Sequence, residues 1–154
     1  MPTPEEFVEQ CRRYIGVRFH RQGRSRHGMD CAGLPAVAAH DLGISDGAEK
    51  IQDYAPVPFG QQLERYCKLF MRQVPYNRLQ RLSGQIKPAD ILLFWVETEG
   101  VPRHLGVYSG VNESNRPCMV HSYAQENRGV IEVPINDYWR MRIHSVYRIK
   151  EFSE

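Results

Sequence analysis

The sequence predicts an α+β fold in which helices come first and an antiparallel β-sheet follows. Residues 4–42 contain two stretches with apolar side chains at helical spacing, each preceded by a capping residue and followed by glycine. From residue 90 onward, short runs rich in β-branched and aromatic residues are separated by turn-forming residues. Helices segregated from strands in this order are typical of the α+β class. A chain of 154 residues can bury a core of its own, so residues 1–154 are expected to form a single domain.

Three helices are expected, over residues 4–15, 30–42 and about 61–72. Thr3 caps the first helix and Gly16 ends it, whereas Asp30 is the expected N-cap of the second. Pro35 lies inside the second helix and cannot donate a hydrogen bond to the carbonyl group of Cys31. Either the first turn of this helix is distorted or that carbonyl group has another partner.

Five strands are expected after an irregular link over residues 74–88. They span residues 90–96, 104–108, 118–123, 129–134 and 143–149. The first is almost continuously apolar, as in a strand that is covered on both faces. A single turn at residues 136–139 separates the last two strands.

Composition and charge narrow the classes of partner. The net charge of +2 does not indicate a nucleic-acid-binding protein. The longest unbroken apolar run, Ile91 to Val96, is too short to span a bilayer. Residues 1–6 are polar and acidic and lack the basic and apolar regions of a signal peptide. If the protein acts outside the cell, it is expected to leave by another route, such as lysis or as part of a virion.

Cys31 is the candidate nucleophile, because it stands where a loop becomes a helix. The positive end of the helix dipole favours the thiolate and predicts a lowered pKa. Six arginines and no acid occur from residue 12 to residue 29. They form either a solvated loop or a positive field that lowers the pKa of Cys31 and attracts carboxylate-bearing substrates, and both can hold for different arginines. The other cysteines, Cys11, Cys67 and Cys118, are expected to be free thiols, with the first two in the core.

A thiol nucleophile needs a histidine base within hydrogen-bond reach, and the base usually needs an orienting group. His104 and His121 are the best candidates, since both lie on expected strands beside turns and can face the start of the Cys31 helix. The other histidines are poorer candidates: His40 lies roughly 13 Å along the same helix, His20 and His27 lie in a loop, and His144 is expected to be structural or on the surface.

A zinc site made of Cys31, His104 and His121 is the metal alternative. The sequence has no His-Glu-x-x-His motif and no closely spaced pair of ligands. We therefore expect no metal and no other cofactor.

Four stretches, taken in order, resemble the NlpC-type cell-wall cysteine peptidases. They read Gly-Met-Asp-Cys-Ala-Gly-Leu at residues 28–34, Pro-Ala-Asp-Ile-Leu-Leu-Phe at 88–94, His-Leu-Gly-Val-Tyr at 104–108 and Val-His-Ser at 120–122. Residues 21–24 and the strand at residues 130–133 look most like the phage tail-associated branch of that family. The resemblance covers nearly the whole chain. It implies a papain-like fold, with the cysteine at the N-terminus of a helix packed on the sheet.

The resemblance also implies the chemistry. Cys31 matches the nucleophile, His104 the general base and His121 the polar residue that orients His104. The implied reaction is hydrolysis of amide bonds in peptidoglycan stem peptides, often next to D-glutamate or a diamino acid, without a cofactor. The backbone N–H group of Cys31 is a natural donor to the oxyanion.

Two positions beside the cysteine depart from the pattern of the family. Many members have a tyrosine where this chain has Phe19, so His20 or Gln22 is expected to supply the missing substrate contact. Many have serine after the cysteine, where this chain has Ala32, although Asp30 is retained as a substrate-binding residue.

Three hypotheses about function follow. The first is a phage tail-associated endopeptidase that cleaves stem peptides during penetration of the host wall. It would be made in the host cytoplasm, carried in the virion tail in contact with other tail proteins, and active in the wall or periplasm. The second is a structural tail-tip protein on the same fold with little or no peptidase activity. The third is a hydrolase of another small amide or acyl substrate.

Overall fold

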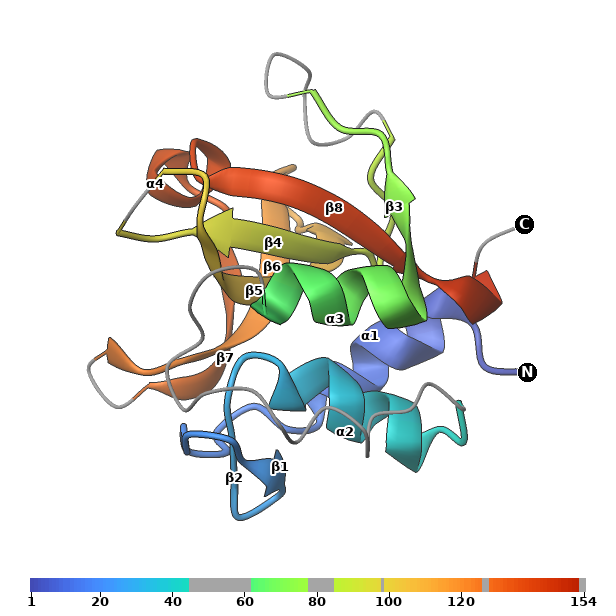
Figure 1. Ribbon diagram of the computed structural model, residues 1–154. Helices are drawn as coiled ribbons and strands as arrows, with labels where there is room; N and C mark the ends of the chain where they lie inside the picture. The colour runs from blue at the N-terminus through green and yellow to red at the C-terminus, as the bar shows by residue number, and fades with distance from the viewer. Residues whose placement is uncertain (45–61, 78–84, 98, 126–127, 153–154) are drawn as a thin grey trace.

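Residues 1–44, 62–77, 85–97, 99–125 and 128–152 are described by a computed structural model of the chain. In these residues a six-stranded antiparallel sheet carries the three longer helices on one face (Figure 1). This arrangement confirms the α+β class, with N-terminal helices packed on a C-terminal sheet. None of the helices in the described ranges is long and apolar enough to cross a membrane.

The helices are α1 (Pro4–Arg12), α2 (Gly33–Asp41), α3 (Gln62–Phe70) and the single-turn α4 (Asp137–Arg140), and a 3-10 helix spans Lys150–Phe152. The strands β1 (Arg24–Ser25) and β2 (Gly28–Met29) pair as a small ribbon ahead of α2. The six-stranded sheet has the order β3-β8-β4-β5-β6-β7. Its strands are β3 (Met71–Val74), β4 (Ile91–Trp95), β5 (Pro102–Val111), β6 (Pro117–Tyr123), β7 (Gly129–Pro134) and β8 (Ile143–Ile149).

The five expected strands are confirmed as β4 to β8, although β5 is longer than expected at both ends. The prediction of a third helix to about residue 72 is wrong at its end. Met71 and Arg72 belong instead to β3, where Met71 pairs with Ile149 of β8. Both residues form helices readily, so only the distant partner strand selects the extended conformation. Residues 78–84 of the expected irregular link lie outside the described residues.

The start of α2 answers the question raised by Pro35. The helix begins at Gly33, later than a helix capped directly by Asp30 would. Pro35 therefore lies in the first turn, where a backbone N–H group has no partner within the helix and nothing is lost. Asp30 still acts as a cap, because its Oδ1 atom accepts a hydrogen bond of 2.7 Å from the N–H group of Gly33.

Gly33 also makes a contact that no other residue could make. A Cβ atom at this position would lie 2.1 Å from the carbonyl oxygen of Gly23. The turn before the β1–β2 ribbon thus packs directly on the backbone of the first turn of α2. This contact fixes the segment that carries Cys31 against the chain that precedes it.

The sheet is buried on both faces. On the helix side, the core includes Cys11 and Cys67, both 0% exposed, and all four cysteines are free thiols as expected. On the other side, Trp139 of α4 and Ile86 help to cover Leu92 and Phe94 of β4. The continuous apolar run of β4 is explained by this double coverage, which confirms the expectation from sequence.

Candidate active site

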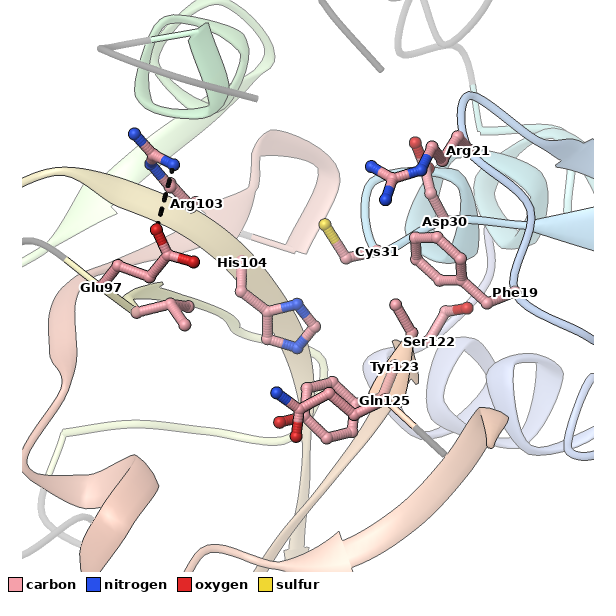
Figure 2. A pocket seen from close by; sticks show the side chains of 12 residues that line it. Phe19, Arg21, Asp30, Cys31, Glu97, Arg103, His104, Ser122, Tyr123 and Gln125 are labelled. Atoms are coloured by element: carbon pink, nitrogen blue, oxygen red, sulfur yellow. Dashed lines mark ion pairs between the residues drawn. The ribbon is translucent and has the colours of Figure 1, made fainter. Parts of the chain in front are cut away.

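The N-terminal end of α2 borders a cavity of about 210 Å³ (Figure 2). Its lining residues come from three parts of the chain. They are Phe19, Arg21, Asp30 and Cys31 ahead of α2, Val96, Glu97, Arg103 and His104 where β4 ends and β5 begins, and Ser122, Tyr123, Ala124 and Gln125 at the end of β6. Cys31 and His104, which were expected to act together, therefore share one cavity.

The two candidate histidines are hydrogen-bonded to each other. His104 Nε2 lies 2.7 Å from His121 Nδ1, and the two residues are 7% and 1% exposed. Because this contact occupies Nε2, the Nδ1 atom of His104 is left for the thiol, and Figure 2 shows the imidazole of His104 beside Cys31. For Nδ1 to accept a proton, Nε2 must carry the hydrogen of the neutral ring and donate it to His121. The contact is compatible with the tautomer that a general base needs, in which Nε2 of His104 is the donor.

Aromatic side chains surround this histidine pair. The ring of His104 lies 5.2 Å from the ring of Trp139, 5.7 Å from Tyr123 and 6.0 Å from Phe94, measured between centroids. Tyr123 also stacks on His121 at 5.2 Å and an angle of 18°. These contacts hold both imidazoles in place and keep the pair in surroundings of low dielectric constant.

Burial governs the protonation of the thiol. It raises the pKa of Cys31 from 9.0 to about 12, and the carboxylate of Asp30 adds to the rise. The backbone N–H groups of Leu105 and Ala32, which hydrogen-bond to the sulfur, oppose the rise and so does Arg24. The sequence predicts a lowered pKa, whereas burial raises it here, because the loss of water outweighs the backbone N–H groups and Arg24.

Burial has the opposite effect on the histidines. It holds the pKa of His104 well below 6.5, with a further lowering by His121. It also lowers the pKa of His121 to about 4. At rest the site therefore contains a neutral thiol and two neutral imidazoles, and a proton must move when the thiol attacks.

The carboxylate of Asp30 holds the segment that leads to the nucleophile. Its Oδ1 atom accepts hydrogen bonds from the N–H group of Gly33 and from Arg24 Nη1, at 2.7 and 3.0 Å, and Oδ2 accepts one of 3.1 Å from the N–H group of Gln22. Asp30 is only 4% exposed. These bonds assign Asp30 a positioning role, and its expected contact with substrate stays a prediction.

No family model matches the chain. A curated relative, the murein DD-endopeptidase MepS/murein LD-carboxypeptidase of Escherichia coli strain K12, is 26% identical over 143 residues, which cover 92% of this chain. Relatives of the same name from the Escherichia coli strains O6:H1 and O157:H7 match with the same identity and coverage. The chain spans only 61% of the length of these relatives.

Two solved structures are similar over 96% of this chain. One is an NlpC/P60 family protein from Bacillus cereus ATCC 10987, with a TM-score of 0.67, 19% identity and 40% of that chain covered. The other is the NlpC/p60 domain of the peptidoglycan hydrolase SagA, with a TM-score of 0.60, 17% identity and 100% of that chain covered. The chain has the NlpC/P60 fold. The resemblance inferred from the motifs is confirmed, whereas the phage tail-associated branch stays a prediction.

The residues that depart from the NlpC-type pattern occupy distinct places. Phe19 lines the cavity, so a phenyl ring stands where many NlpC-type peptidases have a phenol. Ala32 is fully buried. His20 and Gln22 are exposed and are not among the lining residues. Gln22 instead has a backbone φ of 59° and uses its N–H group to bind Asp30, and its expected contact with substrate stays a prediction.

The zinc alternative can be compared with the side chains that the structure describes. Across the described ranges, no three histidine, cysteine or acidic side chains gather where they could hold a metal ion. Two of the three residues of the zinc alternative, His104 and His121, do lie together, but their imidazole nitrogens are hydrogen-bonded to each other at 2.7 Å. That geometry suits proton transfer better than metal binding.

Sequence reasoning missed Arg103 and Trp139. Arg103 lines the cavity next to the expected base, and its position directly before His104 was the available signal. Trp139 was expected only as part of a turn, yet it is 6% exposed and packs on both histidines. A large aromatic residue in a short turn is a signal of packing against a neighbouring element, although it does not name that element.

Proposed function

We propose that this chain is a cysteine peptidase that hydrolyses amide bonds in the stem peptides of peptidoglycan. The observation that carries the proposal is that Cys31 and His104 share one cavity and that His104 is hydrogen-bonded to His121. The names of the MepS relatives and of the SagA domain, which refer to murein and peptidoglycan, support this class of substrate. Because the chain spans 61% of the MepS length, the proposal concerns the activity of this chain by itself.

In the first half of the reaction, Cys31 Sγ attacks the carbonyl carbon of the scissile amide. The thiol proton passes to Nδ1 of His104 during the attack, since both groups are neutral at rest. His121 stabilises the imidazolium by accepting the hydrogen bond from Nε2. His104 then gives the proton to the leaving amine, the C–N bond breaks, and the acyl group remains on Cys31 as a thioester.

In the second half, water attacks the thioester and His104 accepts one of its protons. The C–S bond breaks, the carboxylic acid leaves, and the sulfur regains its proton. The backbone N–H group of Cys31 is the proposed donor to the oxyanion in both halves. The two halves together consume one water molecule and regenerate the thiol of Cys31.

The test is digestion of purified peptidoglycan followed by mass spectrometry of the released fragments. The wild-type protein is expected to release stem-peptide fragments and the Cys31→Ala variant none. Cys118→Ala is the matched control, because this second cysteine is 6% exposed like Cys31 but does not line the cavity. Equal release of fragments by wild type and Cys31→Ala would rule out Cys31 as the nucleophile. No release by the wild type would rule out the proposed peptidase activity.

We further propose that the peptidase acts from a phage tail, in contact with other tail proteins, during penetration of the host wall. Residues 21–24 and 130–133, which resemble the tail-associated branch, are the support for this location. Antibody labelling of purified virions is expected to find the chain at the tail. Its absence from virions of the phage that encodes it would contradict the proposal.

A structural tail-tip protein is the second candidate. It is favoured by Phe19 in the cavity, by the buried Ala32 and by the raised pKa of Cys31. Replacing the gene by the Cys31→Ala allele separates the candidates. A structural protein predicts intact tails and normal infection with this allele, whereas a peptidase predicts intact tails that fail to penetrate the wall.

A further inference from the structure

A β-bulge directs Arg103 into the same cavity as the candidate base. Phe94 of β4 pairs with His104 of β5, but the next residue, Trp95, pairs with Pro102, so Arg103 has no counterpart on β4. Adjacent residues of a regular strand point to opposite faces, whereas a bulge redirects the extra side chain. As a result both Arg103 and His104 line the cavity, although they are neighbours in sequence (Figure 2).

The guanidinium group of Arg103 is incompletely paired. Its Nε atom is buried and has no hydrogen-bond partner in the part of the chain that the structure describes. Its ion-pair partner, Glu97, lies 3.7 Å from Nη1, which exceeds hydrogen-bond distance, and its side chain is 78% exposed to water. A buried N–H group without an acceptor is unfavourable, so a rotation of the guanidinium group that brings Nε to an acceptor on a ligand is favoured.

A second guanidinium group lies on the opposite side of the thiol. Arg21 also lines the cavity, and Figure 2 shows Arg21 and Arg103 on either side of the Cys31 sulfur. Two acids, Asp30 and Glu97, balance the formal charge of these arginines at the cavity. Asp30, however, is buried and already accepts hydrogen bonds from Arg24 and the backbone, and Glu97 is largely solvated. Arg21 and Arg103 therefore keep N–H donors for an acidic group of a substrate.

We propose that Arg103 is a specificity-determining residue that binds a carboxylate of the substrate, with Arg21 adding positive potential from the other side. The inference rests on the proposed function and names what that site selects. The planar fork of a guanidinium group matches the two oxygens of a carboxylate and allows a two-point contact. Because Arg103 adjoins His104, this carboxylate belongs to a residue close to the scissile amide.

Two carboxylates of a stem peptide could fill this position, and binding to an inactive protein distinguishes them. The probe is a synthetic γ-D-Glu–Lys–D-Ala peptide in three forms: unmodified, amidated at the α-carboxylate of D-glutamate, and amidated at the C-terminus. Affinities for Cys31→Ala are measured by calorimetry, with and without Arg103→Gln. Amidation of the carboxylate that Arg103 binds is expected to weaken binding about tenfold or more. Arg103→Gln is expected to weaken binding of the unmodified peptide by the same factor. It is expected to leave the affinity for the peptide amidated at that carboxylate unchanged.

Three further variants make the test specific. Arg116→Gln, at an exposed site in the β5–β6 connection, is the matched control and is expected to leave affinity unchanged. Arg103→Lys keeps the charge without the fork and is expected to recover only part of the affinity. Glu97→Gln removes the competing acid and is expected to tighten binding, an opposite sign that a purely structural role of Arg103 would not produce.

Several outcomes overturn the inference. It fails if Arg103→Gln weakens all three peptides equally, if it weakens none, or if no peptide binds. These results do not depend on hydrolysis, because every protein carries Cys31→Ala. The proposed peptidase can also stand without the role of Arg103. That is the result if the wild type digests peptidoglycan and Arg103→Gln, made in the active protein, has the same KM.

Discussion

The two sides of the cavity are built in different ways. The sheet side presents His104 and Tyr123 to the cavity, with His121 and Trp139 packed behind them. Its aromatic residues are held by strand pairing and by several ring contacts each, and the charged Glu97 and Arg103 also line this side. The loss of any one contact on the sheet side leaves the others in place.

The loop side consists of Phe19, Arg21 and Asp30. It carries charge, and Asp30 supplies three of the hydrogen bonds that hold it, to Gly33, Arg24 and Gln22. The base and its hydrogen-bond partner thus lie on the side with redundant support, whereas the nucleophile follows the segment that depends on one carboxylate. Arg21 on the loop side can therefore change without disturbing the hydrogen bond between His104 and His121 on the sheet side.

The largest expected effect comes from Asp30→Ala. Removing the carboxylate breaks the ion pair with the partly buried Arg24 and removes the cap of the first turn of α2, which is expected to cost about 3–5 kcal/mol in the free energy of unfolding. Displacement of the segment that carries Cys31 is expected to lower kcat/KM about 100-fold or more. Urea unfolding and peptidoglycan digestion measure the two effects.

Asp90 provides the matched control for Asp30. It is 1% exposed, accepts a hydrogen bond of 2.9 Å from the N–H group of Lys87, and binds Arg148 through two bonds of 2.7 and 2.8 Å, but it does not line the cavity. Asp90→Ala is expected to lose similar stability while each folded molecule keeps its activity. Equal loss of activity in both variants would show that the loop side has no special dependence on its carboxylate.

The next largest effect tests the sheet side. His121→Gln keeps an acceptor near Nε2 of His104 but stabilises the imidazolium less well, so kcat is expected to fall about 10- to 100-fold. KM and the unfolding midpoint are expected to change little, because Tyr123 and Trp139 still hold His104 in place. A variant that unfolds as readily as Asp30→Ala would show that the sheet side is not redundantly supported.

A smaller effect is expected in the pH dependence of stability. Burial lowers the pKa of His121 to about 4 in the folded chain, below the 6.5 of an exposed imidazole, so the unfolded chain binds more protons between these values. The free energy of unfolding should therefore fall as the pH falls from 6.5 towards 4, by at most about 1.4 kcal/mol per pH unit for each such histidine. His121→Gln should flatten the curve, and an unchanged slope would place the titration elsewhere.

The smallest effect concerns the resting thiol. Because burial raises the pKa of Cys31 to about 12, alkylation by iodoacetamide should be slow near neutral pH and still rise above about 8.5, where an exposed thiol is half ionised. The rate is followed by mass spectrometry of the peptide that contains Cys31. A rate that levels off in mildly acidic solution would reveal a thiolate–imidazolium pair at rest and contradict the neutral site.

Sequence predicted the elements whose signals are local. The alternation of His104 to Tyr108 and of Cys118 to Tyr123 identifies β5 and β6. The two histidines lie on these strands, which are neighbours in the sheet. Thr3 caps α1 as expected, through a hydrogen bond of 3.1 Å from the N–H group of Glu6. These features depend on residues close together in the chain, so the pattern alone determines them.

The features that sequence could not predict depend on distant partners. The bulge that directs Arg103 into the cavity arises from the register of β5 against β4, and no residue type at that position predicts it. The direction of the Cys31 pKa shift depends on how much of the chain covers the sulfur. β3 likewise exists only because β8 offers an edge.

The contact between Gly33 and Gly23 affects how mutational scans of this chain can be interpreted. Any side chain at position 33 would overlap a backbone oxygen, which cannot move aside as a flexible side chain can. A library that varies every position near Cys31 should therefore return glycine at position 33, and the inactive clones will report misplacement of the nucleophile. Intolerance at that position, two residues from the sulfur, should not be interpreted as a role in the reaction.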